Sequence, residues 1–315
     1  MMRRAALSVS LVLTMACDRE PPALPAVGVA VHRDSIESWH AWRQNFIYGP
    51  TGWATLVGLW WMKPGETTIG ADLENRIALP RERSPKTLGS IWIAGDSARF
   101  VAAPGVRATV DTNKEPVQQV RLRSDLEPKA TTVRVGPLVL YYIVRNGQHG
   151  VRIKDTLNPI RKSAAPLRYF PIDGAWRVQA RFVKSPKPDS MSIMSVLGME
   201  TRMAHPGDLH FSLRGQRYSL MAIREPEDHG KDVFVMFTDS TNRKETYPSM
   251  RYVWVSPPDS LDRTVIDFNK AYNPPCAFTT FATCPFPPKG NALPLRVEAG
   301  EWNPHYDAKE KQPRP

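Results

Sequence analysis

The chain has 315 residues, 42% of them hydrophobic, which is enough apolar content to bury a core. Its thirty prolines and nineteen glycines favour short strands and turns over long helices. The net charge of +11 is spread along the chain without a run of five like charges, which argues against nucleic acid as a partner. Two interpretations of this charge stay open, an anionic surface such as lipid headgroups or wall polymer and a basic surface without a specific partner.

The first seventeen residues have the pattern of a bacterial lipoprotein signal. Arg3 and Arg4 give a positive start, and the apolar run 5–16 is too short to span a bilayer, which needs about 20 residues. The run ends with Cys17 after a small residue, although the leucine stands four residues before the cysteine instead of three. We expect cleavage before Cys17 and its lipidation, which would anchor the protein to a membrane of the cell envelope, on the periplasmic or extracellular side. Ordinary cleavage near this point with a free Cys17 is the alternative.

We divide the chain into four parts on these grounds. Residues 1–17 are the signal peptide, and residues 18–31, rich in proline and alanine, are a tether. Residues 32–303 are predicted to form a single, mainly β domain. Residues 304–315 are charged and proline-rich, which predicts a disordered tail.

One amphipathic helix is predicted at the start of the domain, at about residues 35–46. A capping sequence at 34–37 precedes it, and Ile36, Trp39, Trp42 and Phe46 follow at helical spacing.

An aromatic group extends from this helix into the next segment, with members Trp39, Trp42, Trp53, Trp60 and Trp61. These rings could form a stacking platform for sugars, but we expect them in the core, where each removes about 150–250 Å² from water. Because adjacent strand residues point to opposite faces, one of the last two tryptophans can be exposed.

Beyond the helix the hydrophobic period changes to two, as in strands. The strand-like runs are 99–101, 106–110, 117–122, 131–135, 138–144, 176–183, 190–197, 209–213, 218–223, 233–238, 252–255, 265–268 and 295–298. About a dozen short strands at this spacing predict a mainly β fold, a sandwich or a partly open barrel, with one N-terminal helix.

Two stretches of the sequence resemble the family known as domain of unknown function 1684. The first is Trp39-His40-Ala41-Trp42-Arg43 followed by Gly52 to Trp61, and the second runs from Asp267-Phe268-Asn269-Lys270-Ala271-Tyr272-Asn273-Pro274-Pro275-Cys276 through Cys284-Pro285 to Ala299-Gly300-Glu301. Weaker similarity lies at 150–155, 170–173 and 239–247, so the resemblance spans about residues 36–301. It implies a shared fold and site position and carries no established activity.

The sequence departs from the family pattern in two places. The glycines that usually precede Arg251 are replaced by residues 248–250, Pro-Ser-Met, and the aromatic Gly-Leu stretch before Phe170 is replaced by 164–168. If those glycines let the backbone approach a ligand, that contact is lost here.

The loop 267–291 combines polar residues with two cysteines. Seven residues separate Cys276 from Cys284, whereas zinc-binding cysteines usually stand two to four apart, so we expect no metal site. With Cys17 lipidated, these two cysteines remain as a pair, which predicts a disulfide in an oxidising compartment. Buried structural thiols and a reactive thiol remain as alternatives.

Six polar residues form the candidate ligand-binding set: Asp239, Glu245, Arg251, Asp267, Asn269 and Asn273. Carboxylates and an arginine in one concave place could bind or polarise a polar ligand. A turn with a surface ion pair at 239–251 is the plainer interpretation. His205 and His210 flank a Pro-Gly turn and are expected to be structural.

Three functions remain open. The first is a membrane-tethered domain that binds a small polar or anionic ligand. The second is a hydrolase-type enzyme whose centre is formed by carboxylates and an arginine, and the third is a structural envelope protein without a ligand. The sequence has none of the nucleophile-elbow, zinc-helix, phosphate-loop or dinucleotide motifs, and it names no cofactor or protein partner.

Overall fold

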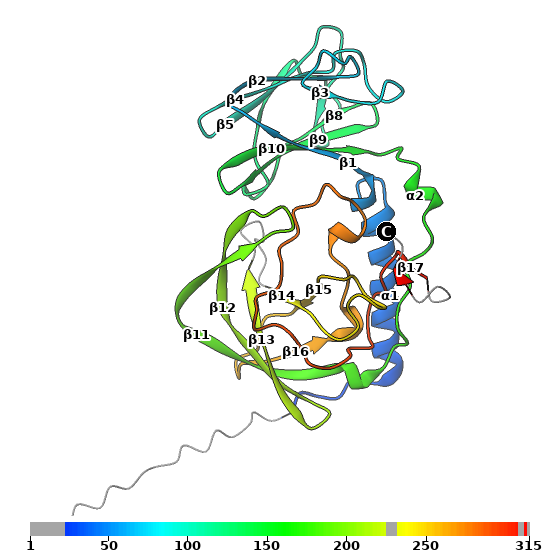
Figure 1. The fold of residues 1–315 in the computed structure, drawn as a ribbon, viewed down its shortest axis with the longest axis vertical. Helices are drawn as coiled ribbons and strands as arrows, with labels where there is room; N and C mark the ends of the chain where they lie inside the picture. The colour runs from blue at the N-terminus through cyan, green and yellow to red at the C-terminus, as the bar shows by residue number, and fades with distance from the viewer. Residues whose placement is uncertain (1–22, 225–231, 308–311, 314–315) are drawn as a thin grey trace, which may run out of the picture.

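The computed structural model describes residues 23–224, 232–307 and 312–313. The fold is mainly β with one long N-terminal helix, which confirms the predicted fold class. The strands fall into two groups, drawn one above the other in Figure 1. We call residues 56–155 the N-terminal unit and residues 163–303 the C-terminal unit. The signal peptide, including Cys17, lies outside the described residues.

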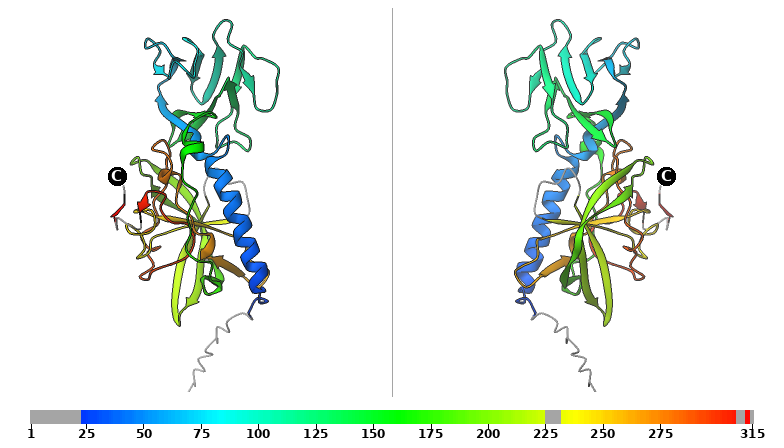
Figure 2. Two further views of the ribbon diagram at one scale, coloured as in Figure 1. Left: turned by 90° about the vertical axis from the view of Figure 1, so that its right-hand side faces the viewer. Right: turned by 90° about the vertical axis from the view of Figure 1, so that its left-hand side faces the viewer.

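Helix α1 (Val29–Tyr48) begins earlier than predicted. Its buried residues His32, Ile36, Arg43 and Ile47 are spaced four, seven and four apart, so they share one face of the helix. The helix begins after Gly28 without a side-chain cap, and the last three residues of the predicted tether belong to it. Figure 2 shows α1 running along the C-terminal unit.

The N-terminal unit is a sandwich of two five-stranded sheets. One sheet has the order β1-β10-β9-β8-β6 and the other β3-β2-β4-β5-β7. Apolar side chains from both sheets, among them Ile91, Phe100, Leu140 and Ile153, form one buried core between them. The strands are β1 (Leu56–Met62), β2 (Gly65–Gly70), β3 (Ile77–Ala78), β4 (Gly89–Ala94), β5 (Ser97–Ala102), β6 (Thr109–Val110), β7 (Gln119–Leu122), β8 (Thr132–Val135), β9 (Leu138–Arg145) and β10 (Gln148–Asp155).

The C-terminal unit is one curved six-stranded sheet, a half-barrel with the order β15-β14-β13-β12-β11-β16. Its core contains Leu209, Phe211, Leu220, Val253 and Ile266. A short helix α2 (Ile160–Ser163) precedes the sheet. Its strands are β11 (Arg177–Met194), β12 (Glu200–Leu213), β13 (Gln216–Arg224), β14 (Val233–Phe237), β15 (Arg251–Val255) and β16 (Arg263–Asp267).

The long hairpin of β11 and β12 bends where its register shifts, between Lys184 and Asp189. Opposite this shift, Gly207 has φ +154°, and a Cβ there would lie 2.3 Å from the carbonyl oxygen of Val183. The glycine therefore permits a β-bulge, which changes the direction of the outer half of the hairpin. The tip of the hairpin is thereby directed toward the N-terminal unit (Figure 1).

Several sequence predictions differ from the structure. Residues 295–298 form no strand; they belong to an irregular segment in which side chains bond the backbone of Val297, Arg251 donating to its carbonyl oxygen and Asp239 accepting from its N–H. The predicted runs begin at residue 99, so they include none of β1, β2, β3 and β4, and they also omit β10. Within the tail predicted to be disordered, the two-residue strands β17 (Tyr306–Asp307) and β18 (Gln312–Pro313) pair with each other.

The remaining elements are short 3₁₀ turns: η1 (Trp53–Thr55), η2 (Gly174–Trp176), η3 (Phe268–Lys270) and η4 (Pro275–Ala277).

Among the described residues, no helix is long and apolar enough to cross a membrane.

Candidate functional site

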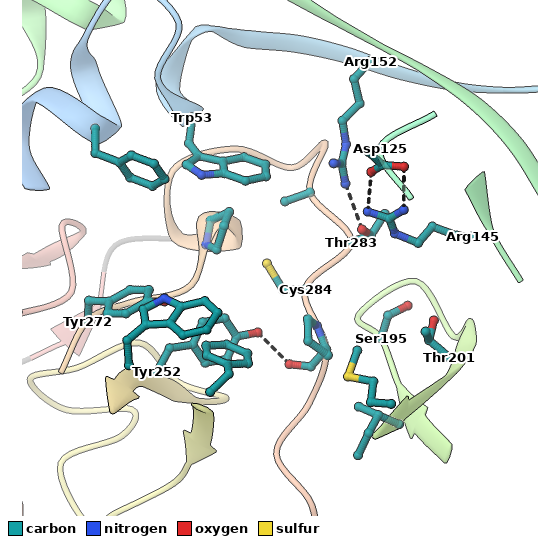
Figure 3. Close-up of a pocket in the computed structure, with 18 of the residues that line it drawn as sticks. Trp53, Asp125, Arg145, Arg152, Ser195, Thr201, Tyr252, Tyr272, Thr283 and Cys284 are labelled. Carbon is teal, nitrogen blue, oxygen red and sulfur yellow. Dashed lines mark hydrogen bonds and ion pairs between the residues drawn. The ribbon is translucent and has the colours of Figure 1, made fainter. Parts of the chain in front are cut away.

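A cavity of about 570 Å³ lies between the two units. The N-terminal unit contributes Asp125, Thr132, Tyr141, Arg145, Arg152 and Lys154; α1 and η1 contribute Trp39, Trp42, Arg43, Phe46 and Trp53; the hairpin tip contributes Ile193, Ser195, Met199, Thr201 and Met203; and the rest of the C-terminal unit contributes Phe234, Tyr252, Trp254, Tyr272, Pro275, Ala282, Thr283, Cys284 and Pro285. Figure 3 shows side chains from both units facing this space.

Strand β10 places two cations on the cavity wall. Val151 and Ile153 alternate with Arg152 and Lys154, and successive strand residues point to opposite faces. The two apolar residues enter the sandwich core, so both cations face the cavity.

Arg152 is 4% exposed and has no carboxylate partner among the described residues. Its Nη2 donates a hydrogen bond to Thr283 Oγ1 at 2.8 Å, across the boundary between the units. Its guanidinium lies 5.6 Å from the centroid of the Trp53 ring, and its Nε is buried without a hydrogen-bond partner. A buried charge without a counter-ion is costly, so this side chain is suited to receive an anion.

Lys154 is half-buried beside Arg152. Its Nζ donates to the carbonyl oxygen of Thr51 at 2.5 Å and lies 5.4 Å from the Tyr141 ring centroid. Burial, and then the positive charge of Arg152, lower the pKa of Lys154 to about 8. Burial also raises the pKa of Tyr141, although the neighbouring Arg152 opposes this rise. In the described part of the chain, Lys154 has no carboxylate partner either.

Asp125 is the one carboxylate among the described residues that line the cavity. It accepts two hydrogen bonds from Arg145, at 3.1 Å and 2.8 Å, which form a bidentate pair (Figure 3). Because this arginine neutralises it, Asp125 leaves the charges of Arg152 and Lys154 uncompensated.

Aromatic rings cover much of the remaining wall. Trp42 stacks on Phe46 with 4.9 Å between the ring centroids, and Trp254 lies 4.7 Å from Phe234. The sequence predicted Trp42 and Phe46 in the core, but they are 54% and 42% exposed. The helix instead buries the face that carries Arg43, because Arg43 pairs with the buried carboxylate of Glu301. Trp42 and Phe46 therefore face the cavity.

For the adjacent tryptophans Trp60 and Trp61, the prediction that one is exposed is confirmed. Trp60 packs on the sandwich core, and Trp61 is partly exposed.

The two cysteines lie side by side, and Cys284 lines the cavity. Both are free thiols, and the backbone N–H of Cys276 donates to Cys284 Sγ at 3.2 Å. A hydrogen bond from the Cys284 thiol lowers the pKa of Cys276, whereas burial raises that of Cys284. The disulfide therefore stays a prediction, and the proximity it requires is present.

Asp239 and Arg251, from the predicted ligand-binding set, form a fully buried ion pair. Arg251 Nη1 donates to Asp239 Oδ2 at 2.9 Å and to the carbonyl oxygen of Val297 at 2.8 Å. Arg251 also donates to the carbonyl oxygen of Ala299. We call the irregular stretch 274–303 the C-terminal segment. Arg251, at the start of β15, donates to carbonyl groups of this segment that have no strand partner there, which explains why a buried arginine is useful at this place.

Glu245 and Asn273 also hold this segment. Glu245 pairs with Arg296 at 2.8 Å. Asn273 accepts from the backbone N–H of Tyr247 and donates to Glu301 Oε1 at 2.9 Å. Arg43 Nε donates to the other oxygen of Glu301 at 2.8 Å, so α1 is tied to the same network.

Asp267 and Asn269 lie in a third place, near the start of α1. Asp267 Oδ2 is 2.8 Å from His32 Nε2, and Asp267 Oδ1 accepts from the backbone N–H of Asn269, which caps η3. Asn269 Nδ2 donates to the carbonyl oxygen of Asp173 at 2.9 Å. The six residues thus occupy separate polar clusters that hold backbone, and none of them lines the cavity.

Sequence reasoning missed Arg152 and Lys154 as site residues, although they lie in one of the weaker stretches of family resemblance. The available signal was the pattern Val-Arg-Ile-Lys, in which cations alternate with core residues in a strand. His205 and His210 flank no turn, since both lie within strand β12, and His205 Nε2 is 3.0 Å from Asp208 Oδ1. The described residues contain no group of three or more histidine, cysteine or acidic side chains placed to hold a metal ion.

Comparison with known proteins gives a family without an assigned activity. No curated protein matches the chain. A solution structure of an uncharacterised protein from Haloarcula marismortui is 33% identical, covers 45% of this chain and 78% of that chain, and has a TM-score of 0.39. The FHA domain of FhaA in complex with the intracellular domain of Rv3910 is 17% identical, over 30% of this chain and 85% of that chain, with a TM-score of 0.22. Residues 163–302 match the family described as Protein of unknown function (DUF1684), and the chain belongs to that family.

Proposed function

We propose that this protein binds a small organic anion in the cavity between its two units. The observation that carries the proposal is the pair Arg152 and Lys154, which face the cavity without a carboxylate partner among the described residues. The two cations are two residues apart on one strand face and repel each other; burial, and then this repulsion, lower the pKa of Lys154. An anion between them would relieve this repulsion and satisfy Arg152 Nε.

Binding is better supported than hydrolysis. A hydrolase centre built on carboxylates needs an acid or base that is free to exchange a proton. The cavity carboxylate, Asp125, is instead held by both nitrogens of the Arg145 fork. A purely structural envelope protein would not need uncompensated cations in an internal cavity, since such charges cost stability.

We further propose that the domain works at a membrane of the cell envelope, on its periplasmic or extracellular side, tethered by a lipid on Cys17. Support comes from the sequence of the first seventeen residues, which have a positive start, a short apolar run and a small residue before the cysteine. A tethered binding domain would meet ligands outside the cytoplasm.

The test is calorimetric titration of the purified full chain with 2-naphthoate and with its neutral analogue 2-naphthamide. A hydrogen bond to a charged group contributes about 1.5–3 kcal/mol, so we expect the carboxylate to bind at least about tenfold more tightly. Arg152→Met should lower naphthoate affinity by about tenfold or more and leave naphthamide affinity unchanged. Since Arg152 is buried without a carboxylate partner, this variant should stay folded.

Arg121→Met is the matched control, because Arg121 is an exposed arginine on β7, in the other sheet of the sandwich and outside the cavity lining. It removes the same charge and should leave both affinities unchanged. Equal binding of the acid and the amide, or an equal loss in the two arginine variants, would refute the proposal.

A further inference from the structure

The walls of the cavity identify the kind of anion that fits it. Nine of the lining side chains are aromatic, whereas six are aliphatic or thioether groups: Ile193, Met199, Met203, Pro275, Ala282 and Pro285. A site for a flexible alkyl chain needs only apolar surface, whereas rings that present flat faces favour a flat partner through stacking.

The rings stand on opposite sides of the space. Figure 3 shows Trp53 on the side of the N-terminal unit, with Tyr252 and Tyr272 across the cavity from it. Trp53 also lies under the cations, since Arg152 and Lys154 are 5.6 Å and 5.9 Å from its centroid. A ligand whose anionic group reaches these cations would therefore place its body among rings from both units.

Aromatic surface at the cavity also remains in contact with water. Trp42, Phe46 and Trp254 are 54%, 42% and 40% exposed, and all three line the cavity. The first two stack on each other from one helix face, and Trp254 comes from β15. Large exposed rings beside a concave site are typical of surfaces that are covered when a ligand binds.

We propose that the ligand is an aromatic acid, a flat ring system bearing an anionic group, with the anion at Arg152 and Lys154 and the ring against the cavity tryptophans. This rests on the proposed function and adds the substrate class to it. The pairing of a cationic strand with aromatic walls distinguishes this class from inorganic anions, which need no rings, and from alkyl acids, which gain nothing from stacking.

The test compares 2-naphthoate with undecanoate by calorimetric titration of the full chain. Both are carboxylates with eleven carbons, so they differ in shape and not in charge. Aromatic pairs contribute about 0.5–1.5 kcal/mol beyond buried area, and more than one ring is available, so we expect about tenfold tighter binding of naphthoate. Trp42→Leu and Trp254→Leu should each weaken naphthoate severalfold and change undecanoate less than about twofold.

Trp92→Leu is the control, because Trp92 is 39% exposed on β4 and does not line the cavity. It should change neither affinity. If undecanoate binds as tightly as naphthoate and Arg152→Met weakens both, the aromatic inference is overturned while anion binding stands. If neither acid binds, the proposed function itself is overturned. Circular dichroism of each variant verifies that it is folded.

Discussion

Three arginines among the described residues are almost fully buried, and they differ in how their charge is met. Arg43 faces Glu301 and Arg251 faces Asp239, each within 2.9 Å. Arg152 has no carboxylate partner among the described residues; the neutral groups at its side chain include the hydroxyl of Thr283, the face of Trp53 and Tyr141. Replacing one member of a satisfied buried pair leaves a charge uncompensated, whereas Arg152 already carries that cost. Only Arg152 is therefore suited to gain an external anion.

Lys154 gives this site a pH dependence. Its pKa of about 8 lies below its ordinary value because burial and Arg152 disfavour the ammonium form, so the free protein carries half of this charge at about pH 8 and nearly all of it only below about pH 7. We expect naphthoate affinity to be constant from about pH 6 to 7 and to fall as the pH rises above about 8, since naphthoate itself stays ionised. A bound anion stabilises the ammonium form and so raises the pKa of Lys154. The affinity therefore falls gradually between the pKa of the free protein and that of the complex.

Calorimetric titration at several pH values measures this dependence. Lys154→Met should bind naphthoate more weakly at neutral pH and show a flat profile over the same range. A wild-type affinity that is constant from pH 6 to 10 would contradict a role for the ammonium group.

At the scale of elements, two segments position the site. Strand β10 lies between β1 and β9, so its register is fixed on both sides and its cations have defined places. The C-terminal segment is irregular and is held by side chains, among them Arg251 and Asn273, and it supplies Thr283 and Cys284 to the cavity. Four of the six residues predicted to bind a ligand, Asp239, Glu245, Arg251 and Asn273, are therefore supports of this segment.

Arg251→Met tests that assignment. Because it leaves Asp239 buried and two carbonyl groups without their donor, it should lower the free energy of unfolding by about 3–5 kcal/mol. Chemical denaturation measures this loss. The matched variant Arg263→Met breaks an exposed ion pair with Asp259 and should cost far less. If Arg251→Met remains folded, its naphthoate affinity should be close to that of the wild type. A loss of binding without a loss of stability would show that Arg251 belongs to the ligand site and is not a structural support.

At the scale of the whole molecule, the cavity exists because two units with separate cores meet. The sandwich presents β9 and β10, the half-barrel presents the tip of its long hairpin and the loop to Pro285, and α1 runs along the second unit to the boundary (Figures 1 and 2). A ligand in this space would contact both units. Its binding would stabilise their arrangement by an amount set by its concentration relative to its dissociation constant.

The proposed lipid anchor is also tested on the whole molecule. We expect the wild-type chain to sediment with membranes from its bacterial host, because diacyl attachment at Cys17 gives stable anchoring. Cys17→Ala removes the lipidated thiol and should abolish incorporation of radiolabelled palmitate into the protein. Cys276→Ala is the control and should label as the wild type does. Equal labelling of the Cys17 variant would show that this residue is not the lipid site.

The sequence by itself determined the mainly β class, the N-terminal helix and the identity of several strands, because period-two runs and turn residues are local signals. Its limits are visible at particular residues. The helix begins at Val29 instead of about residue 35, since the contact of His32 with the distant Asp267 fixes its first turn. Strand β10 was missed because its charges mask the apolar alternation until its two neighbouring strands are known.

Only the tertiary structure decided which polar residues are supports and which face the cavity. Six polar residues were of the types that form ligand sites, but their partners are backbone groups and counter-ions, several of them far away in the chain. These residues are Asp239, Glu245, Arg251, Asp267, Asn269 and Asn273. In the sequence, Arg152 and Lys154 resemble ordinary charged residues on the exposed face of a strand. Only the three-dimensional structure shows that they have no carboxylate partner among the described residues. The physical reason is that local sequence sets backbone preference, whereas the cost of a buried charge depends on groups that folding brings to it.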